Sequence, residues 1–181
     1  VDGGLESEGY FESDGSDDYI TTEFDLTNHC IGKNQAGCPN LGDFTMNAWV
    51  LFDSITVEQH FFGRHYGNGR FYFGIDNSGA VYHLGVGDDY SIFGGSIDGS
   101  PAIAHGISAG TWANVTVTFD NSDPTSAQGG TVNVYTNAVF KGTFGASWTQ
   151  TSTIDPILMG RNNNGTDDSF LDGKMGPIMV Y

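Results

Sequence analysis

The nine residues FTMNAWVLF, residues 44–52, give the clearest strand signal in this chain. Hydrophobic side chains occupy every second position, which is the two-residue period of a β-strand and not the period of a helix. The residues expected on one face are Phe44, Met46, Ala48, Val50 and Phe52. Because Trp49 and Leu51 fall on the opposite face, the pattern predicts a strand near the centre of a two-sheet sandwich, covered on both sides.

Shorter strand signals, separated by turn residues, continue on both sides of this segment. Residues 114–119 alternate in the same way, and residues 71–75 and 81–86 flank a four-residue turn, as in a hairpin. Further strands are expected at residues 19–22, 132–136, 139–140, 157–159 and 178–181. Helical periodicity is nearly absent, so the predicted fold class is all-β, an antiparallel two-sheet sandwich.

The length and charge of the chain narrow the possible functions. We expect residues 1–181 to form a single domain, with residues 1–9 as a linker or first edge strand, because no boundary is visible. The net charge of -16 disfavours binding to nucleic acid and to anionic membranes. No hydrophobic run approaches the ~20 residues of a membrane span, so membrane insertion is not expected.

Cys30 and Cys38 enclose a short polar segment rich in turn-forming residues. This spacing predicts a disulfide that closes a small surface loop. A disulfide implies an oxidising compartment, so we expect an extracellular location, on a cell or virion surface. The alternative is two free thiols or half of a metal site, for which His29 is the adjacent further ligand.

Five segments resemble motifs of laminin-G-like domains, which belong to the concanavalin A-like lectin/glucanase jelly rolls. They are residues 11–20 (FESDGSDDYI), 44–50 (FTMNAWV), 110–120 (GTWANVTVTFD), 134–139 (VYTNAV) and 170–181 (FLDGKMGPIMVY). The segments follow the family order and span nearly the whole chain. The resemblance therefore implies a jelly-roll sandwich, and it implies that Trp49 and Trp112, which lie inside the motifs, belong to the core.

Two positions depart from the family pattern. Ala138 replaces the turn glycine, and because alanine disfavours the positive φ of a two-residue turn, we expect this hairpin to use another turn. Gly176 and Pro177 replace an Asp-Glu pair before the last strand. That replacement removes two carboxylates near a place where relatives often hold structural calcium.

The resemblance also covers glycosidases and polysaccharide lyases, whose residue patterns are missing here. No glutamate has the Glu-x-Asp-x-x-Glu spacing that places two carboxylates on one strand face. Gln59 and His60 are adjacent, whereas the alginate-lyase pattern needs them to alternate. We therefore expect no catalytic residues. A polysaccharide lyase or glycosidase with an unusual site, using His60 or His65 as a base, is the alternative.

Sugar binding needs an aromatic platform beside fixed polar groups. Trp148 lies in an expected loop outside the family motifs, which makes it the best stacking candidate, although it could instead pack against a neighbouring strand. Two further loop aromatics and three residues able to donate hydrogen bonds complete the set. The predicted ligand-binding residues are Arg64, His65, Tyr66, Asn68, Tyr90 and Trp148.

Acidic residues cluster in segments expected to be loops, where carboxylates and turns suit calcium. The predicted metal ligands are Asp14, Asp17 and Asp18 near the start, and Asp167, Asp168 and Asp172 near the end. The resemblance implies that the two ends of the chain lie together, so both clusters could hold one structural calcium ion. Solvated turns are the alternative, because neither cluster matches the EF-hand loop pattern.

These observations predict a non-catalytic extracellular module that binds a glycan or polysaccharide, or serves in adhesion, and is stabilised by calcium. The main alternative is a structural jelly-roll subunit of a virion or surface filament. Such a subunit would assemble with itself or with a larger virion or surface protein.

Overall fold

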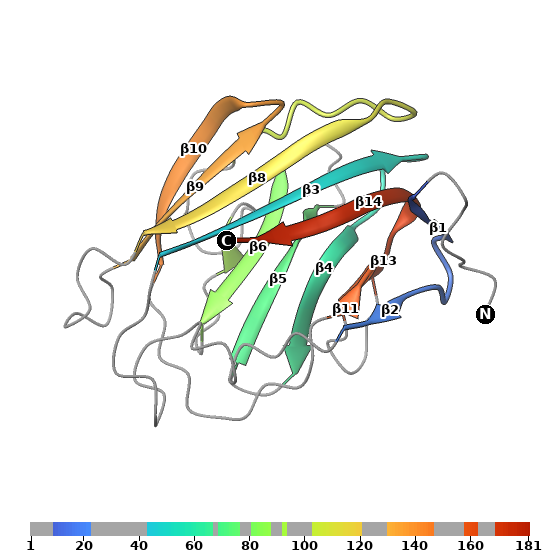
Figure 1. Ribbon diagram of the computed structural model, residues 1–181, viewed down its shortest axis with the longest axis horizontal. Coiled ribbons are helices and arrows are strands. Elements are labelled where there is room, and N and C mark those ends of the chain that lie inside the picture. Colours follow the sequence, from blue (N-terminus) through green and yellow to red (C-terminus); the bar gives the residue numbers. More distant parts are fainter. Residues whose placement is uncertain are drawn as a thin grey trace.

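The computed structural model describes residues 9–22, 43–66, 69–76, 81–87, 92–93, 103–120, 130–146, 158–162 and 169–181. All regular secondary structure in these residues is β-strand, and the strands form two large antiparallel sheets that face each other (Figure 1). The prediction of an all-β antiparallel sandwich is therefore confirmed. The same residues contain no helix long and apolar enough to span a membrane.

One sheet, here called the back sheet, pairs the first strand with the last. Its strand order is β1 (Phe11–Asp14), β14 (Asp172–Val180), β3 (Phe44–Phe52), β8 (Ala113–Asp120), β9 (Gly130–Thr136) and β10 (Val139–Ala146). The pairing of β1 with β14 brings residues from the two ends of the chain side by side, as the resemblance implied. The expected strand at residues 44–52 is confirmed with the same bounds.

The opposite sheet, here called the front sheet, holds the predicted hairpin. Its strand order is β2 (Ile20–Thr21), β11 (Leu158–Met159), β4 (Gln59–Tyr66), β5 (Gly69–Ile75), β6 (Tyr82–Gly87) and β7 (Ile92–Phe93). Two short strands, β12 (Arg161–Asn162) and β13 (Ser169–Phe170), form a separate ladder. The antiparallel pairing of β5 with β6 confirms the hairpin predicted from residues 71–75 and 81–86.

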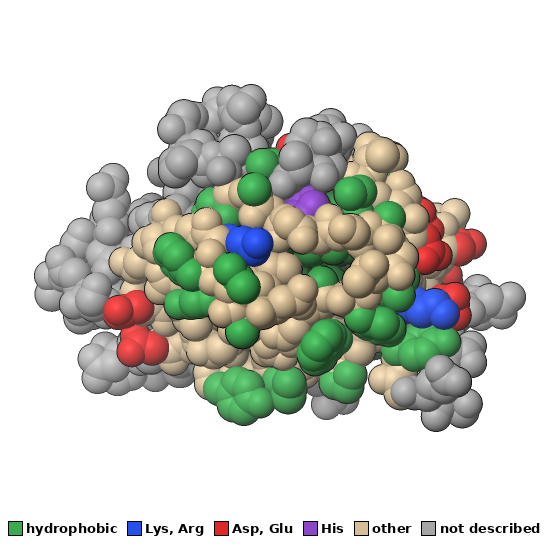
Figure 2. Space-filling view, turned by 90° about the horizontal axis from the view of Figure 1, so that it is seen from above, with side chains coloured by type: hydrophobic (Ala, Val, Ile, Leu, Met, Phe, Trp, Pro, Cys, Tyr) green, Lys and Arg blue, Asp and Glu red, His purple; other side chains and the backbone are tan. Residues whose placement is uncertain are grey.

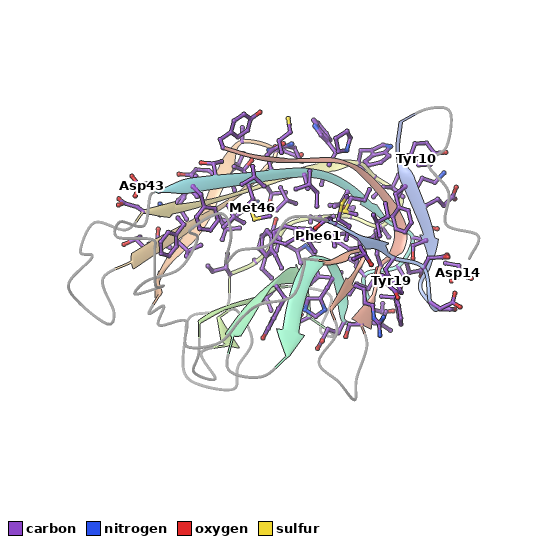
Figure 3. All side chains as sticks on the ribbon, turned by 60° about the horizontal axis from the view of Figure 1, so that its bottom comes forward. Tyr10, Asp14, Tyr19, Asp43, Met46 and Phe61 are labelled. Atoms are coloured by element: carbon purple, nitrogen blue, oxygen red, sulfur yellow. The ribbon has the colours of Figure 1, made fainter. Side chains whose placement is uncertain are left out.

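The core fills the space between the two sheets, where Figure 3 shows Met46 and Phe61. The inward face of β3 is the one that the sequence predicted, and all five of its side chains are buried. Phe61 and Phe73 of the front sheet meet edge to face, with ring centroids 4.8 Å apart. Such aromatic pairs add about 1 kcal/mol to the stabilisation that comes from burial alone.

The hairpin between β9 and β10 corrects one expectation. Asn137 and Ala138 have φ angles of 51° and 62°, so this is the two-residue turn with positive φ that Ala138 was expected to exclude. Pairing of Thr136 with Val139 leaves only these two residues to reverse the chain. Asn137 is held in place because its backbone N–H donates to the Asn114 carbonyl at 2.7 Å, while its side-chain Oδ1 accepts from the Asn114 N–H at 2.8 Å.

Candidate functional site

The predicted ligand-binding residues fall in or beside parts of the chain that the structure leaves undescribed. Arg64, His65 and Tyr66 lie on β4, where their backbones pair with β5. Their side chains lie outside the described part of the structure, as do the residues Asn68, Tyr90 and Trp148. The binding role of all six residues therefore stays a prediction.

The acidic cluster near the start of the chain is compact. One carboxylate oxygen each from Asp14, Asp17 and Asp18 lies within 4.8 Å of the others. Asp172, from the cluster near the chain end, is the cross-strand partner of Asp14. Burial, with added repulsion from Asp53 and Asp14, raises the pKa of Asp172 above its ordinary value. The structure therefore brings Asp172 beside the first cluster, while Asp167 and Asp168 lie outside the described residues.

His60, considered above as a base, is fully buried. Its ring meets Tyr72 edge to face at 5.1 Å, and its Nδ1 lies 3.9 Å from Glu58 Oε1. That carboxylate oxygen also accepts a hydrogen bond from the Ser169 hydroxyl. His60 thus packs into the structure in a position that a polysaccharide chain cannot reach. The two cysteines, Cys30 and Cys38, lie outside the described residues, so the disulfide stays a prediction.

An aromatic cleft of about 460 Å³ opens on the outer face of the back sheet. Its lining residues are Gly9, Tyr10, Trp49, Leu51, Trp112, Lys174, Gly176 and Pro177. A volume of several hundred Å³ is typical of pockets that hold small molecules. Figure 3 shows Tyr10 on the outer side of the sheet, and hydrophobic side chains also project along the lower side of Figure 2.

The two tryptophans of this cleft correct another expectation. Trp49 is 45% exposed and Trp112 is 37% exposed, so neither belongs to the core, and the back sheet is not covered at this place. Tyr10 meets Trp112 edge to face, with ring centroids 6.1 Å apart. A Cβ added at Gly176 would lie only 3.2 Å from the Trp49 Cβ, so the glycine avoids a tight contact with Trp49.

Lys174 supplies the cleft with a fixed donor. Its ammonium group lies 4.6 Å from the centre of the Tyr10 ring, 3.2 Å from the Tyr10 hydroxyl and 3.3 Å from Glu12 Oε1. The hydrogen bond with Tyr10 raises the pKa of Lys174 above its ordinary value against the opposing effect of burial, and Glu12 adds to the rise. Lys174 is therefore charged at neutral pH, held over one ring and partly neutralised by Glu12.

One feature of the sequence indicated that Trp49 is exposed, although its place in a family motif had assigned it to the core. Trp49 and Leu51 share their strand face with Thr45 and Asn47, which are polar, whereas the opposite face is hydrophobic throughout. Polar side chains on one face of a strand are typical of a surface exposed to water. Tyr10 and Lys174 gave no comparable signal, because β1 and β14 are brought together only by pairing between the two ends of the chain.

Comparison with known proteins agrees with this architecture. A family model described as the concanavalin A-like lectin/glucanases superfamily, Laminin_G_3, matches residues 14–181. No curated protein matches the chain in sequence.

Solved structures with the same fold share little sequence with the chain. The CBM40 module of the Ruminococcus gnavus IT-sialidase, bound to α2,3-sialyllactose, is 16% identical, with a TM-score of 0.57; the match covers 93% of this chain and 89% of that one. Domains LG4-5 of the mouse laminin α1 chain are 13% identical, with a TM-score of 0.55 over 95% of this chain. The receptor binding domain of botulinum neurotoxin D is 12% identical, with a TM-score of 0.55 over 96% of this chain. The chain matches 40% of the length of each of these last two structures.

Proposed function

This chain belongs to the concanavalin A-like lectin/glucanase superfamily, and from that premise we propose that it is a non-catalytic, extracellular glycan-binding module. The observation that carries the proposal is the aromatic cleft, where Trp49 and Trp112 are exposed beside Lys174. Sugar rings present apolar C–H faces that stack on aromatic rings, and hydroxyl groups that accept hydrogen bonds from an ammonium group.

Two further observations support the proposal. The CBM40 module with the same fold is bound to α2,3-sialyllactose, so the fold can carry a sugar site. The burial of His60 beside Tyr72 supports a non-catalytic role, because a general base must reach the proton that it removes.

A glycan array with a matched set of variants tests this proposal. We expect the wild-type protein to bind at least one glycan class. Trp49→Ala and Trp112→Ala should each weaken that binding about tenfold or more, which corresponds to roughly 1.4 kcal/mol. Val57→Ala is the control, because Val57 is 51% exposed in the segment between β3 and β4, outside the cleft lining, and its loss should leave binding unchanged.

Folding of each variant is checked by its unfolding midpoint, so that lost binding is not confused with lost structure. An array on which the folded wild-type protein binds nothing would overturn the proposal. Binding that survives in both tryptophan variants would remove the aromatic cleft as its site and direct attention to the predicted residues Trp148 and Tyr66.

Calcium remains part of the proposal as a structural ion. The close approach of Asp14, Asp17 and Asp18, with Asp172 across the sheet from Asp14, supports it because calcium prefers several carboxylate and carbonyl oxygens. We expect calcium to raise the unfolding midpoint relative to EDTA, and Asp17→Asn to remove most of that rise. An equal midpoint in calcium and in EDTA would argue for solvated turns.

Assembly into a larger structure is the second candidate function. Val139 and Phe140 are 58% and 54% exposed at one end of the back sheet, and Met179 is 40% exposed on β14. Exposed apolar side chains of this kind are typical of contact surfaces. A mass that rises with concentration in light scattering, and that Phe140→Ala restores to the monomer value, would favour this candidate.

A further inference from the structure

The outer face of the back sheet continues beyond the aromatic cleft as a row of amide and hydroxyl side chains, here called the polar row. Its members are Asn47, Asn114, Thr116, Thr118, Asn133 and Thr143, from β3, β8, β9 and β10. Directly opposed residues of an antiparallel pair share a face. Trp49 and Asn114 are such partners, so the row begins beside the cleft.

Hydrogen bonds between neighbouring strands hold this row in place. The Asn47 amide donates to Asn114 Oδ1 at 2.9 Å, and the Asn114 amide donates back to Asn47 Oδ1 at 3.0 Å. Farther from the cleft, the Asn133 amide donates to the Thr118 hydroxyl at 3.3 Å, and the Thr143 hydroxyl donates to Asn133 Oδ1. The side chains are thus oriented before any ligand arrives, which lowers the entropy that binding costs.

The far end of the row keeps hydrogen-bonding capacity for a ligand. Asn133 has a second amide hydrogen and a second carbonyl lone pair beyond these two bonds, and each threonine hydroxyl can still accept another bond. Thr143 is exposed, and Thr118 and Asn133 are half-buried. Strands lie about 4.8 Å apart, so the distance from β3 to β10 is about 14 Å, the length of several sugar units.

The charges on and around this surface favour an uncharged sugar over an anionic one. No member of the polar row is ionisable, and Lys174 at the cleft is partly neutralised by Glu12. In Figure 2, the acidic side chains of the described residues gather at the two ends of the molecule. The net charge of -16 repels uronates and sulfated sugars at longer range.

We propose that the outer face of the back sheet binds an extended, uncharged polysaccharide that stacks in the aromatic cleft and runs across the strands along the polar row. The inference rests on the proposed function and deepens it, because it names the ligand class and adds a second set of contacts to the cleft.

Isothermal titration with oligosaccharides of two and six units tests this proposal. The probes are β-1,4-glucan, β-1,4-mannan and β-1,4-xylan fragments, with galacturonan fragments of the same lengths as the anionic counterpart. For at least one neutral series, the six-unit fragment should bind about tenfold or more tightly than the two-unit fragment, because the longer fragment adds hydrogen bonds along the polar row.

Variants separate the two parts of the surface. Asn133→Ala combined with Thr143→Ala should remove most of the gain with length and leave two-unit binding unchanged, whereas Trp49→Ala should weaken both. Thr143→Ser keeps the hydroxyl and is the conservative control. If the double variant does not fold, Thr143→Ala alone is used, because this side chain is exposed at the end of the row.

The outcomes distinguish this inference from the proposal on which it rests. Trp49-dependent binding with no gain from two to six units, or a gain that survives in the Asn133 and Thr143 variants, would overturn the polar row and leave the cleft as a glycan site. Tighter binding of galacturonan would overturn the uncharged ligand class. No binding of any probe, neutral or anionic, by the folded protein would overturn this inference, and a blank glycan array as well would overturn the proposed function.

Discussion

The two faces of β3 differ although they belong to the same nine residues. The inward face is apolar and buried throughout, and Phe52 at its end has no exposed surface. The outward face carries a threonine, an asparagine, a half-buried leucine and a tryptophan that is 45% exposed. Because side chains alternate along a strand, neighbouring residues serve different purposes: one set holds the sandwich together and the other is presented to a ligand.

The largest predicted difference between the two faces is in the free energy of unfolding that is lost when an aromatic side chain is removed from each. Phe52→Ala should lower the free energy of unfolding by about 3–5 kcal/mol, because it leaves a cavity between the sheets. Trp49→Ala removes a larger side chain but should lower it by only about 1 kcal/mol, since nearly half of that side chain already contacts water. Urea unfolding of both variants measures the contrast. Equal losses would mean that Trp49 is structural.

Two glycines of β14 allow a similar comparison, between a position with no room for a side chain and a position with more room. Gly173 has a φ of 142°, and a Cβ there would lie 2.0 Å from the Leu51 carbonyl oxygen, so Gly173→Ala should lower the free energy of unfolding by about 2–3 kcal/mol. A Cβ at Gly176 would meet only the Trp49 side chain, at 3.2 Å, or backbone farther away.

Gly176→Ala is therefore the control for Gly173→Ala. Because the nearest contact of an added Cβ is 3.2 Å at Gly176 and 2.0 Å at Gly173, Gly176→Ala should lower the free energy of unfolding by less than about 1 kcal/mol. It should nevertheless change glycan binding if the cleft is the site. A Gly173→Ala variant as stable as Gly176→Ala would contradict the close packing of β14 against β3.

The alternating strands could be predicted from the sequence because each has one covered face. Strand β3 matches its predicted bounds, and β8 extends the prediction by one residue at each end. Strand β4 gave no such signal, because a register shift between His60 and Phe62 breaks the two-residue period and leaves both Phe61 and Phe62 buried.

The aromatic cleft could be predicted only in part. Alternation separates Trp49 from the core residues of β3, but it does not tell whether another element covers the face on which Trp49 lies. That depends on Gly176 and Pro177, which lie opposite Trp49 in the sheet and leave it open. Tyr10, which precedes β1, and Lys174 of β14 come from opposite ends of the chain, and their approach is a consequence of the topology.

The hairpin between β9 and β10 tests a smaller effect, in a turn whose Asn137 is hydrogen-bonded to Asn114, the cross-strand neighbour of Trp49. Ala138 has a φ of 62°, a left-handed conformation that costs an alanine about 1–2 kcal/mol. Glycine avoids this cost but loses more entropy on folding, so Ala138→Gly should raise the free energy of unfolding by about 0.5–1 kcal/mol. A thermal unfolding series measures the gain. A loss of stability would contradict the turn conformation.

The smallest effect is expected at Asp172, which links the back sheet to the acidic cluster. Its pKa is raised by burial and by the charges of Asp53 and Asp14, so the folded state keeps a proton that the unfolded chain has already lost. Wild-type stability should therefore fall as the pH rises from about 4 through the raised pKa, and the penalty should persist at neutral pH.

Asp172→Asn should remove that fall, because the amide carries no charge, and the variant should gain stability over the wild type as the pH rises. The backbone bonds of this residue, from its N–H to Gln59 Oε1 and from the Asp53 N–H to its carbonyl, do not involve the carboxylate and should survive.

Urea unfolding between pH 3.5 and 7 in EDTA measures the difference in stability between Asp172→Asn and the wild type, which salt should reduce. Asp120→Asn, at the end of β8, is the control for general loss of charge. A wild-type advantage that grows with pH in EDTA would mean that the carboxylate of Asp172 stabilises the fold. If the wild-type advantage over Asp172→Asn grows with pH only when calcium is present, the Asp172 carboxylate binds the calcium ion. The same carboxylate then opposes folding when the ion is absent.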